Sequence, residues 1–587
     1  MENLIHEAPY PRPLPPRTGE GEPERQSLPL FQPLTEYEGA QKPANCTFPP
    51  PVLGGRIREG GHNRRDFLRN GLLAGAGVGA ALLGGAGCGV ARKQARALTG
   101  PTPAAFTPLP ADAGKAGQAA HVLNRIGFGP RPGEVARVAA MGAAAYIEEQ
   151  LADEMEEDPA VAWRVNGLET LQTEQDAPDV LYSLDDGQLM TEMQQAALLR
   201  AVYSRRQLRE NLADFWTNHF NIYALKADGR NLLPTDTERV IRPHVLGTFR
   251  DLLFASAHSP AMLTYLDAQQ NRRGVANENY ARELLELHTL GVHSGYTLKD
   301  IQEVARCFTG WTVKPGFQRG LFTFRKEDFT ERPDWFRYEA ARHDDGAKYV
   351  PFLNLTISPG GGQRDAETVL EHLAAHPATA HFLCRKLCTH FLGHAPDAVV
   401  AKAARAYLKN GSDIRATLRP ILLDALLTPE QNRPKLKRPV EMMVSALRAL
   451  AADTDGGIHL QHHLAAMGQP LFQWPMPDGF PTRTSAWTGS LLPRWNFALA
   501  LASNAIEGTV VDLNTPLAAA EARTDDALLD ALIATVIARP PTAPEARPVR
   551  EQVRRHIAQA RQASVPDATV IAEATGLLLA SPVFQWG

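Results

Sequence analysis

Several features that would place this protein in a class are scarce in its sequence. Its 587 residues include five cysteines, too few for a disulfide-stabilised scaffold. The 61 lysine and arginine residues are nearly balanced by 65 aspartate and glutamate residues, so no bulk charge attracts nucleic acid or anionic membranes. Apart from one glycine-diluted segment near the N-terminus, no run is apolar enough for a membrane span. We therefore expect no nucleic-acid partner and no transmembrane domain beyond that segment.

Motifs that would name a reaction are also absent. The sequence has no HExxH zinc motif and no pair of ExxH motifs of the kind that builds di-iron bundles. It has no G-x-S-x-G nucleophile elbow, no P-loop and no strand-linked G-x-G-x-x-G motif. Candidate functional residues must therefore be sought among polar side chains at positions that the folding pattern buries.

The first hundred residues divide into two segments. Residues 1–60 contain stretches such as "PYPRPLPPRTGEGEPERQ", whose proline and glycine content predicts disorder. Residues 61–97 contain Arg64 and Arg65 followed by Phe67 and Leu68, the R-R-x-F-L pattern of a twin-arginine export signal, and then a weakly apolar region. This route carries proteins that have already folded, often around a cofactor. We therefore predict a periplasmic or extracellular protein.

Two processing routes remain open for this signal segment. In "GGAGC", Cys88 would be the lipidated residue of a degenerate lipobox, although Gly85 stands where leucine is preferred. Alternatively, an ordinary signal peptidase would cut after "ARA" at residues 95–97. The first route predicts a lipid-anchored protein and the second a free one.

Helical periodicity dominates the chain from about residue 115 onward. We predict a mainly α fold, a multi-helix globular assembly that spans residues 115–585. Residues 313–358 alternate apolar and polar side chains, which predicts a small β insertion. Residues 472–487, which begin "FQWPMPDGFP", are predicted to form an aromatic and proline-rich loop with a turn at Asp478 and Gly479.

A carboxylate occupies an unexpected position in the predicted helix 277–291, "NENYARELLELHTLG". At about 100° per residue, Glu283 falls within the apolar arc formed by Tyr280, Leu284, Leu287 and Leu290. Asn279, Glu283 and Glu286 then form one polar stripe beside that arc. A buried carboxylate must be neutral, paired or bound to metal. Either Glu283 forms a salt bridge, for which Arg306 is a reasonable partner, or it belongs to a functional site.

Histidines supply further candidates. His219 lies at the centre of the apolar face of the helix predicted around "ADFWTNHFNIY", and His288 lies at the other edge of the arc that contains Glu283. His343 and Asp344, in "RHDDGAKYV", occupy a predicted turn. Carboxylate oxygens and imidazole nitrogens together suit a hard or borderline divalent metal. We therefore predict metal ligands at His219, Glu283, Glu286 and His288.

Several of these stretches together resemble the DUF1800 family of large bacterial proteins. The resemblance is carried by "DFWTNHFNI", "NENYARELLELHTLGV", "RHDDGAKYV" and "GQPLFQWPMPDGFP", among others, and extends from about residue 121 to 585. It implies a largely helical and often secreted protein. It also implies a partner, because genes of the family commonly neighbour a second exported protein with a phosphatase- or sulfatase-like fold. The family has no established activity or catalytic residue.

Two hypotheses of function follow. The first is an exported, metal-assisted enzyme that acts on envelope or extracellular polymers, in which Glu283, Glu286, His343 and Asp344 act as ligands or as general acid and base. Its substrate-binding residues would be Asn279, Arg282 and Asp478. The second is a non-catalytic binding or maturation partner of the neighbouring phosphatase- or sulfatase-like protein. In that case the same polar residues form a buried structural network, and "FQWPMPDGF" with Trp487 forms a contact surface.

Overall fold

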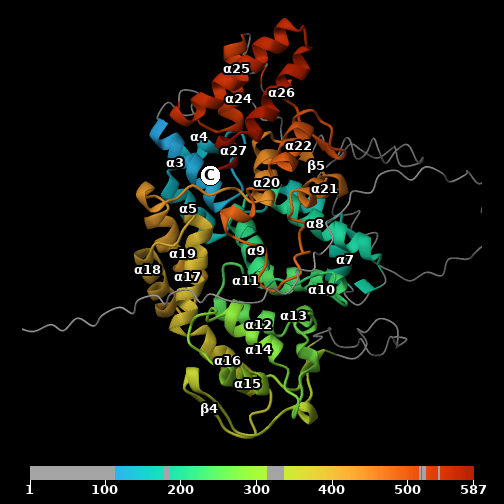
Figure 1. The fold of residues 1–587 in the computed structure, drawn as a ribbon, viewed down its shortest axis with the longest axis vertical. Helices are drawn as coiled ribbons and strands as arrows, with labels where there is room; N and C mark the ends of the chain where they lie inside the picture. The colour runs from blue at the N-terminus through green and yellow to red at the C-terminus, as the bar shows by residue number, and fades with distance from the viewer. Residues whose placement is uncertain are drawn as a thin grey trace, which may run out of the picture. The chain divides into compact units, whose positions relative to one another are not determined.

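The computed structural model describes residues 113–176, 181–182, 184–313, 336–514, 517, 524–539 and 543–586 (Figure 1). Helices make up most of this part, which confirms the predicted mainly α fold. Residues 1–60, the signal segment 61–97 and its Cys88 lie outside the described residues. Within the described part, none of the helices is both long and apolar enough to cross a membrane.

The helices follow one another closely along the chain. The α-helices before residue 310 are α3 (Ala113–Ile126), α4 (Glu134–Met141), α5 (Ala143–Ala152), α6 (Pro159–Val165), α7 (Glu169–Asp176), α8 (Asp186–Tyr203), α9 (Gln207–His219), α10 (Gly229–Thr235), α11 (Arg242–His244), α12 (Phe249–Ala257), α13 (Pro260–Tyr265), α14 (Glu278–Glu283) and α15 (Leu298–Cys307). The later α-helices are α16 (Arg364–Ala374), α17 (Pro377–Leu392), α18 (Asp397–Lys409), α19 (Ile414–Arg419), α20 (Pro439–Ala449), α21 (Ile458–Ala466), α22 (Leu491–Ala502), α24 (Asp525–Val536), α25 (Arg547–Gln562), α26 (Asp567–Ala580) and α27 (Pro582–Gln585).

Strands in the described part are short and paired as antiparallel hairpins. β1 (Trp311–Val313) pairs with β2 (Phe336–Tyr338), and β3 (Lys348–Val350) pairs with β4 (Leu355–Ile357). These pairs fall within or beside the predicted β insertion, of which residues 314–335 lie outside the description. A third pair joins β5 (Asp453–Thr454) to β6 (Thr509–Val510).

Wider π-helical turns occur in three places in the described chain, at η3 (Asp236–Ile241), η5 (Leu284–His288) and η9 (Pro420–Ala425). Such turns insert an extra residue into a helix and are frequent at functional sites. η5 continues α14, so the predicted helix 277–291 is α-helical only up to Glu283.

Apolar side chains bury themselves in two large clusters. The first core is built mainly from α3–α5, α9 and α12–α19 and includes Trp216 and Phe249. The second core is built mainly from α6, α8, α20–α22 and α24–α26 and includes Met442 and Phe497. Figure 1 shows α12–α16 (green to yellow) at the bottom of the view and α24–α26 (red) at the top. The α8–α9 connection passes from the second core to the first.

Candidate functional site

Asparagine side chains fix the start of α14, the helix that carries Glu283. The Asn277 side chain caps the helix by accepting a hydrogen bond from the Asn279 backbone N–H at 2.9 Å. The Asn277 amide also donates to the Asp267 carbonyl, and the Asn279 amide donates to the Leu266 carbonyl, both at 3.1 Å. These contacts tie α14 to the end of α13. Asn279, predicted to bind substrate, therefore holds the helix in place.

Glu283 is half-buried at the junction of α14 and η5. Its carboxylate makes no hydrogen bond and no ion pair with the residues that the structure describes. Burial raises the pKa of Glu283 above its ordinary value, and the negative charges of Glu286 and Asp478 raise it further, whereas Arg282 acts in the opposite direction. Glu283 therefore holds a proton more readily than an exposed glutamate does.

The neighbouring charges of the helix are partly matched. Arg282 lies 3.3 Å from the Glu278 carboxylate and 3.6 Å from the Glu286 carboxylate. Of the two alternatives for Glu283, the salt bridge to Arg306 does not form, because Arg306 pairs with Asp344 and Glu303, each at 2.7 Å. An ion pair therefore does not explain why Glu283 lies within the apolar arc of the helix.

Lys386 of α17 meets His219 of α9. The Lys386 Nζ donates to Nδ1 of His219 at 2.7 Å, and Nε2 of that ring donates to the His288 carbonyl at 3.1 Å. His219 is buried among aromatic rings, including Phe220 and Phe249, and burial together with Lys386 holds its pKa well below the ordinary value. Its imidazole is therefore neutral and is a fixed hydrogen-bond acceptor for Lys386.

Lys386 itself is only partly exposed and has no carboxylate within salt-bridge distance in the described part of the chain. Burial lowers the pKa of its ammonium group to about 8, and the negative charge of Asp478 opposes that change. An ordinary lysine titrates near pH 10.4. At neutral pH Lys386 therefore gives up its proton far more easily than a surface lysine.

The segment 472–481 carries Asp478, whose negative charge acts on the pKa values of Lys386 and Glu283. The Asn221 amide donates to the carbonyls of Trp474 (3.0 Å) and Met476 (2.7 Å), and the Tyr265 hydroxyl donates to the Pro475 carbonyl at 2.8 Å. The Trp474 indole N–H donates to the Asp478 carboxylate at 3.0 Å. Asp478 is exposed, which leaves this side of the site open to solvent.

Gly479 allows the segment to pass close to α9. Its φ of 72° is one that side chains disfavour, and a Cβ added there would lie 2.2 Å from the Asn218 carbonyl oxygen. The Asn218 side chain also accepts from the Phe480 N–H at 2.7 Å and donates to the Phe480 carbonyl at 3.0 Å. The predicted turn at Asp478 and Gly479 is therefore held on both sides.

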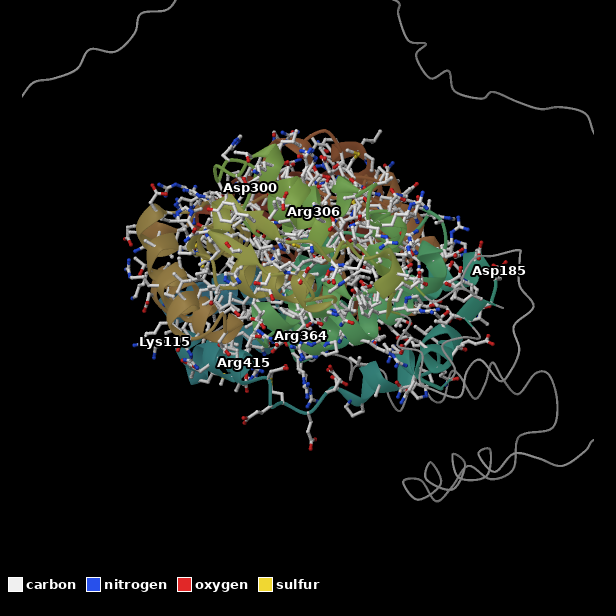
Figure 2. All side chains as sticks on the ribbon, turned by 90° about the horizontal axis from the view of Figure 1, so that it is seen from below. Lys115, Asp185, Asp300, Arg306, Arg364 and Arg415 are labelled. Carbon is white, nitrogen blue, oxygen red and sulfur yellow. The ribbon has the colours of Figure 1, made fainter. Side chains whose placement is uncertain are left out.

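His343 and Asp344 belong to a different cluster. His343 Nδ1 donates to the Thr309 carbonyl at 2.7 Å, and its Nε2 lies 3.1 Å from Asp365, which also pairs with the buried Lys348 at 2.6 Å. Asp344 pairs with Arg306, which is labelled in Figure 2. In the described part of the chain, no hydrogen bond or ion pair joins this network to Glu283. These two predicted catalytic residues have structural partners instead.

The predicted metal ligands do not assemble a metal site. Among the residues that the structure describes, no three histidine, cysteine, aspartate or glutamate side chains are grouped so that they could hold a metal ion. Both ring nitrogens of His219 already have hydrogen-bond partners. His288 is buried against Phe220, and the same burial lowers its pKa to about 3. What links the remaining candidates is charge: the pKa of Glu283 responds to Glu286 and Asp478, and the pKa of Lys386 responds to Asp478.

Lys386 is the residue that sequence reasoning missed. The helical spacing that drew attention to Glu283 applies to it as well, because Leu383, Lys386, Leu387 and His390 follow the i, i+3, i+4, i+7 pattern of one helix face. Leu383, Leu387 and His390 are buried. A lysine on the same helix face as these buried residues is the feature of the sequence that could have identified Lys386.

Comparison with known proteins gives a family and no activity. Residues 121–586 match the family described as a protein of unknown function (DUF1800). No curated protein and no solved structure matches the chain. A function must therefore be argued from the geometry of the site itself.

Proposed function

We propose that this chain, which belongs to the DUF1800 family of proteins of unknown function, is an exported enzyme. It acts by general acid–base catalysis on an envelope or extracellular polymer. One observation carries the proposal. The negative charge of Asp478 raises the pKa of both Glu283, a half-buried carboxylate, and Lys386, a partly buried ammonium group, and neither has an ion-pair partner among the described residues.

Environments that move the pKa values of neighbouring groups away from their ordinary ranges are typical of catalytic acids and bases. Here the pKa of Glu283 is raised and that of Lys386 is lowered, so the two values approach each other from opposite sides. A group whose pKa lies near the working pH transfers protons most effectively. Proton transfer in both directions is thus available within one site.

The proposed roles follow from the charge states at neutral pH. Below its pKa of about 8, Lys386 is mainly an ammonium group and donates a proton to the leaving atom of the substrate. In its ionised form, Glu283 takes a proton from the attacking water or hydroxyl group. Neutral His219 accepts a hydrogen bond from Lys386 and keeps it in position.

The surroundings favour a polar substrate with weakly apolar faces. Trp474 is partly exposed beside Asp478, and aromatic rings beside carboxylates suit sugar rings or similar polymer units. Arg282 and Asp478 supply a charged donor and an acceptor at the edge of the site. Export by the twin-arginine route, proposed from Arg64 and Arg65, would deliver the folded protein to such polymers.

The test is a screen of the full chain against polysaccharide and peptidoglycan preparations, with Glu283→Gln and Lys386→Met as variants. Glu149→Gln and Lys402→Met, which change exposed ion pairs, are matched controls. We expect product release by the wild type and both controls and a loss of at least 100-fold in both site variants. Full activity in folded Glu283→Gln would overturn the proposal.

A second candidate function is binding to the neighbouring phosphatase- or sulfatase-like exported protein. The observation that favours it is an exposed apolar face on α22, where Leu491, Leu492, Trp495 and Leu499 are 46%, 65%, 46% and 44% exposed. Replacing Leu492 and Trp495 by serine should then abolish co-purification of the two proteins and leave the titration of Lys386 unchanged. Unchanged co-purification would remove this candidate.

A further inference from the structure

A cavity separate from Glu283 and Lys386 lies between α8 and α9. It contains about 830 Å³ of space outside protein atoms, including space open to solvent. Residues of the two helices form facing walls, and the segment from Gln469 to Phe480 contributes to a further one. Most of the lining is apolar, with Met193, Ala201, Leu471 and Phe472 as examples. A mainly apolar lining with a small number of polar groups is typical of small-molecule sites.

The charged side chains in the lining are already neutralised by the protein. Arg242 holds Glu210 through two contacts of 2.8 Å, and Arg200 holds Glu238 through contacts of 2.6 and 3.0 Å. Asp214 pairs with Arg438 at 2.5 Å. A charged ligand entering this cavity would lose its hydration without gaining an unmatched opposite charge.

Five neutral polar residues also line the cavity: Thr217, Asn218, Asn221, Thr237 and Gln469. The Asn218 and Asn221 amides are engaged by the backbone of the segment 472–481. The Thr217 hydroxyl lines the cavity and has no hydrogen-bond partner in the part of the chain that is described. It can orient one polar atom of a ligand that is otherwise apolar.

The geometry points to this cavity as a binding site for a neutral, mainly apolar small molecule. The inference does not rest on the proposed acid–base function, because neither Glu283 nor Lys386 lines the cavity. The segment 472–481 is common to both sites, since Phe472 and Phe480 line the cavity and the charge of Asp478 acts on Lys386. Ligand binding therefore acts on the segment that carries Asp478.

The test is a fluorescence titration of the full chain with the neutral probe N-phenyl-1-naphthylamine. Ala197→Phe, on α8, adds bulk to the cavity, and Thr217→Leu, on α9, removes the hydroxyl that would orient a ligand. Ala558→Phe on the exposed face of α25 is the matched control. We expect saturable binding by the wild type and the control, and a Kd at least tenfold higher in each cavity variant that stays folded. Thr217→Leu adds little volume and serves where the larger residue prevents folding.

A second arm of the same experiment tests the charge of the ligand. The anionic probe 8-anilinonaphthalene-1-sulfonate should displace the neutral probe at least tenfold less effectively than unlabelled neutral naphthalene compounds of similar size. Equal displacement by the anion, or binding of the neutral probe that neither cavity variant weakens, would overturn the assignment.

Discussion

Two side chains, Glu283 and Lys386, carry the proposed acid–base chemistry. Most buried charges in the described chain are matched, as Lys348 and Asp365 are at 2.6 Å. Glu283 and Lys386 are not matched in this way, and burial displaces the pKa of each toward neutrality. A charge without a fixed partner changes its protonation at little cost. That property is useful for proton transfer and of no use for holding a fold together.

Glu283→Gln is predicted to leave stability intact. Its carboxylate has no ion pair to lose, and removing its charge relieves repulsion from Glu286 and Asp478. We expect the free energy of unfolding at pH 7.5 to be unchanged or higher by up to about 1 kcal/mol, as measured by urea denaturation. Glu441→Gln is the contrast, because Glu441 pairs with Arg438 and Lys435, and its loss should cost about 3 kcal/mol. Equal destabilisation by both substitutions would mean that Glu283 has a structural partner.

The raised pKa of Asp236 leads us to predict that this residue makes the folded state less stable as the pH rises. It is buried, with the Ser259 hydroxyl as a donor at 2.5 Å, and burial raises its pKa from 3.8 to about 7. Between about pH 4 and pH 7 the folded state holds a proton there that the unfolded state has lost, so this residue lowers stability as pH rises through that window. Asp236→Asn should therefore raise the free energy of unfolding at pH 8 by a few kcal/mol and change it little at pH 4. A variant with the wild-type pH dependence would contradict this.

At the scale of helices and loops, the sequence predicted the helix that carries Glu283 but not the change from α-helix to π-helix within it. Helical periodicity correctly indicated a helix from 277, yet η5 widens the chain after Glu283 and rotates the following residues. Regular periodicity contains no signal for such a turn, because it depends on packing. For the same reason the spacing of polar residues placed Glu283 and Glu286 together but gave them the wrong neighbours.

The turn at His343 and Asp344 shows a second limit of prediction from the sequence. Its residue types suit a site as well as a structural network, and the choice depends on partners far along the chain. Asp365 and Thr309 use both ring nitrogens of His343, and Arg306 takes Asp344. Such long-range pairing is set by tertiary packing and leaves no local pattern in the sequence.

The segment 472–481 yields a prediction for Gly479→Ala. The added methyl would collide with the Asn218 carbonyl at 2.2 Å, and a φ of 72° strains any side chain. We expect a loss of about 2 to 4 kcal/mol in the free energy of unfolding and faster amide exchange across 472–481. Gly489→Ala, where nothing lies within 4 Å, should change neither quantity. Slow exchange retained in Gly479→Ala would show that the segment does not depend on this close approach.

In the whole described molecule, the site lies where parts of the two cores meet. α9, α13, α14 and α17 belong to the first core, whereas Leu471 and Phe472, which precede Asp478, belong to the second. The mainly α fold was predictable because amphipathic helices dominate the sequence. The meeting of Asp478 with Lys386 was not, since it depends on how the two cores pack.

The proposed twin-arginine export of the entire chain can be tested by substitution of its two arginines. Changing both Arg64 and Arg65 to lysine removes the guanidinium pair of the proposed twin-arginine signal and leaves the helical region untouched. We expect the full-length protein to remain folded in the cytoplasm, as detected by cell fractionation and immunoblotting. Lysine substitution at Arg58 and Arg92 is the control and should permit export. Export of the double-lysine variant at the wild-type level would contradict the proposed route.

The acid–base account depends most directly on the titration of Lys386. Competitive acetylation of the full chain from pH 6 to pH 11, followed by mass spectrometry of the peptide that contains Lys386, measures the pKa of that amine. The account predicts a value of about 8, and a lower value in Asp478→Asn because the opposing negative charge is gone. A pKa for Lys386 at or above 10 would contradict the account.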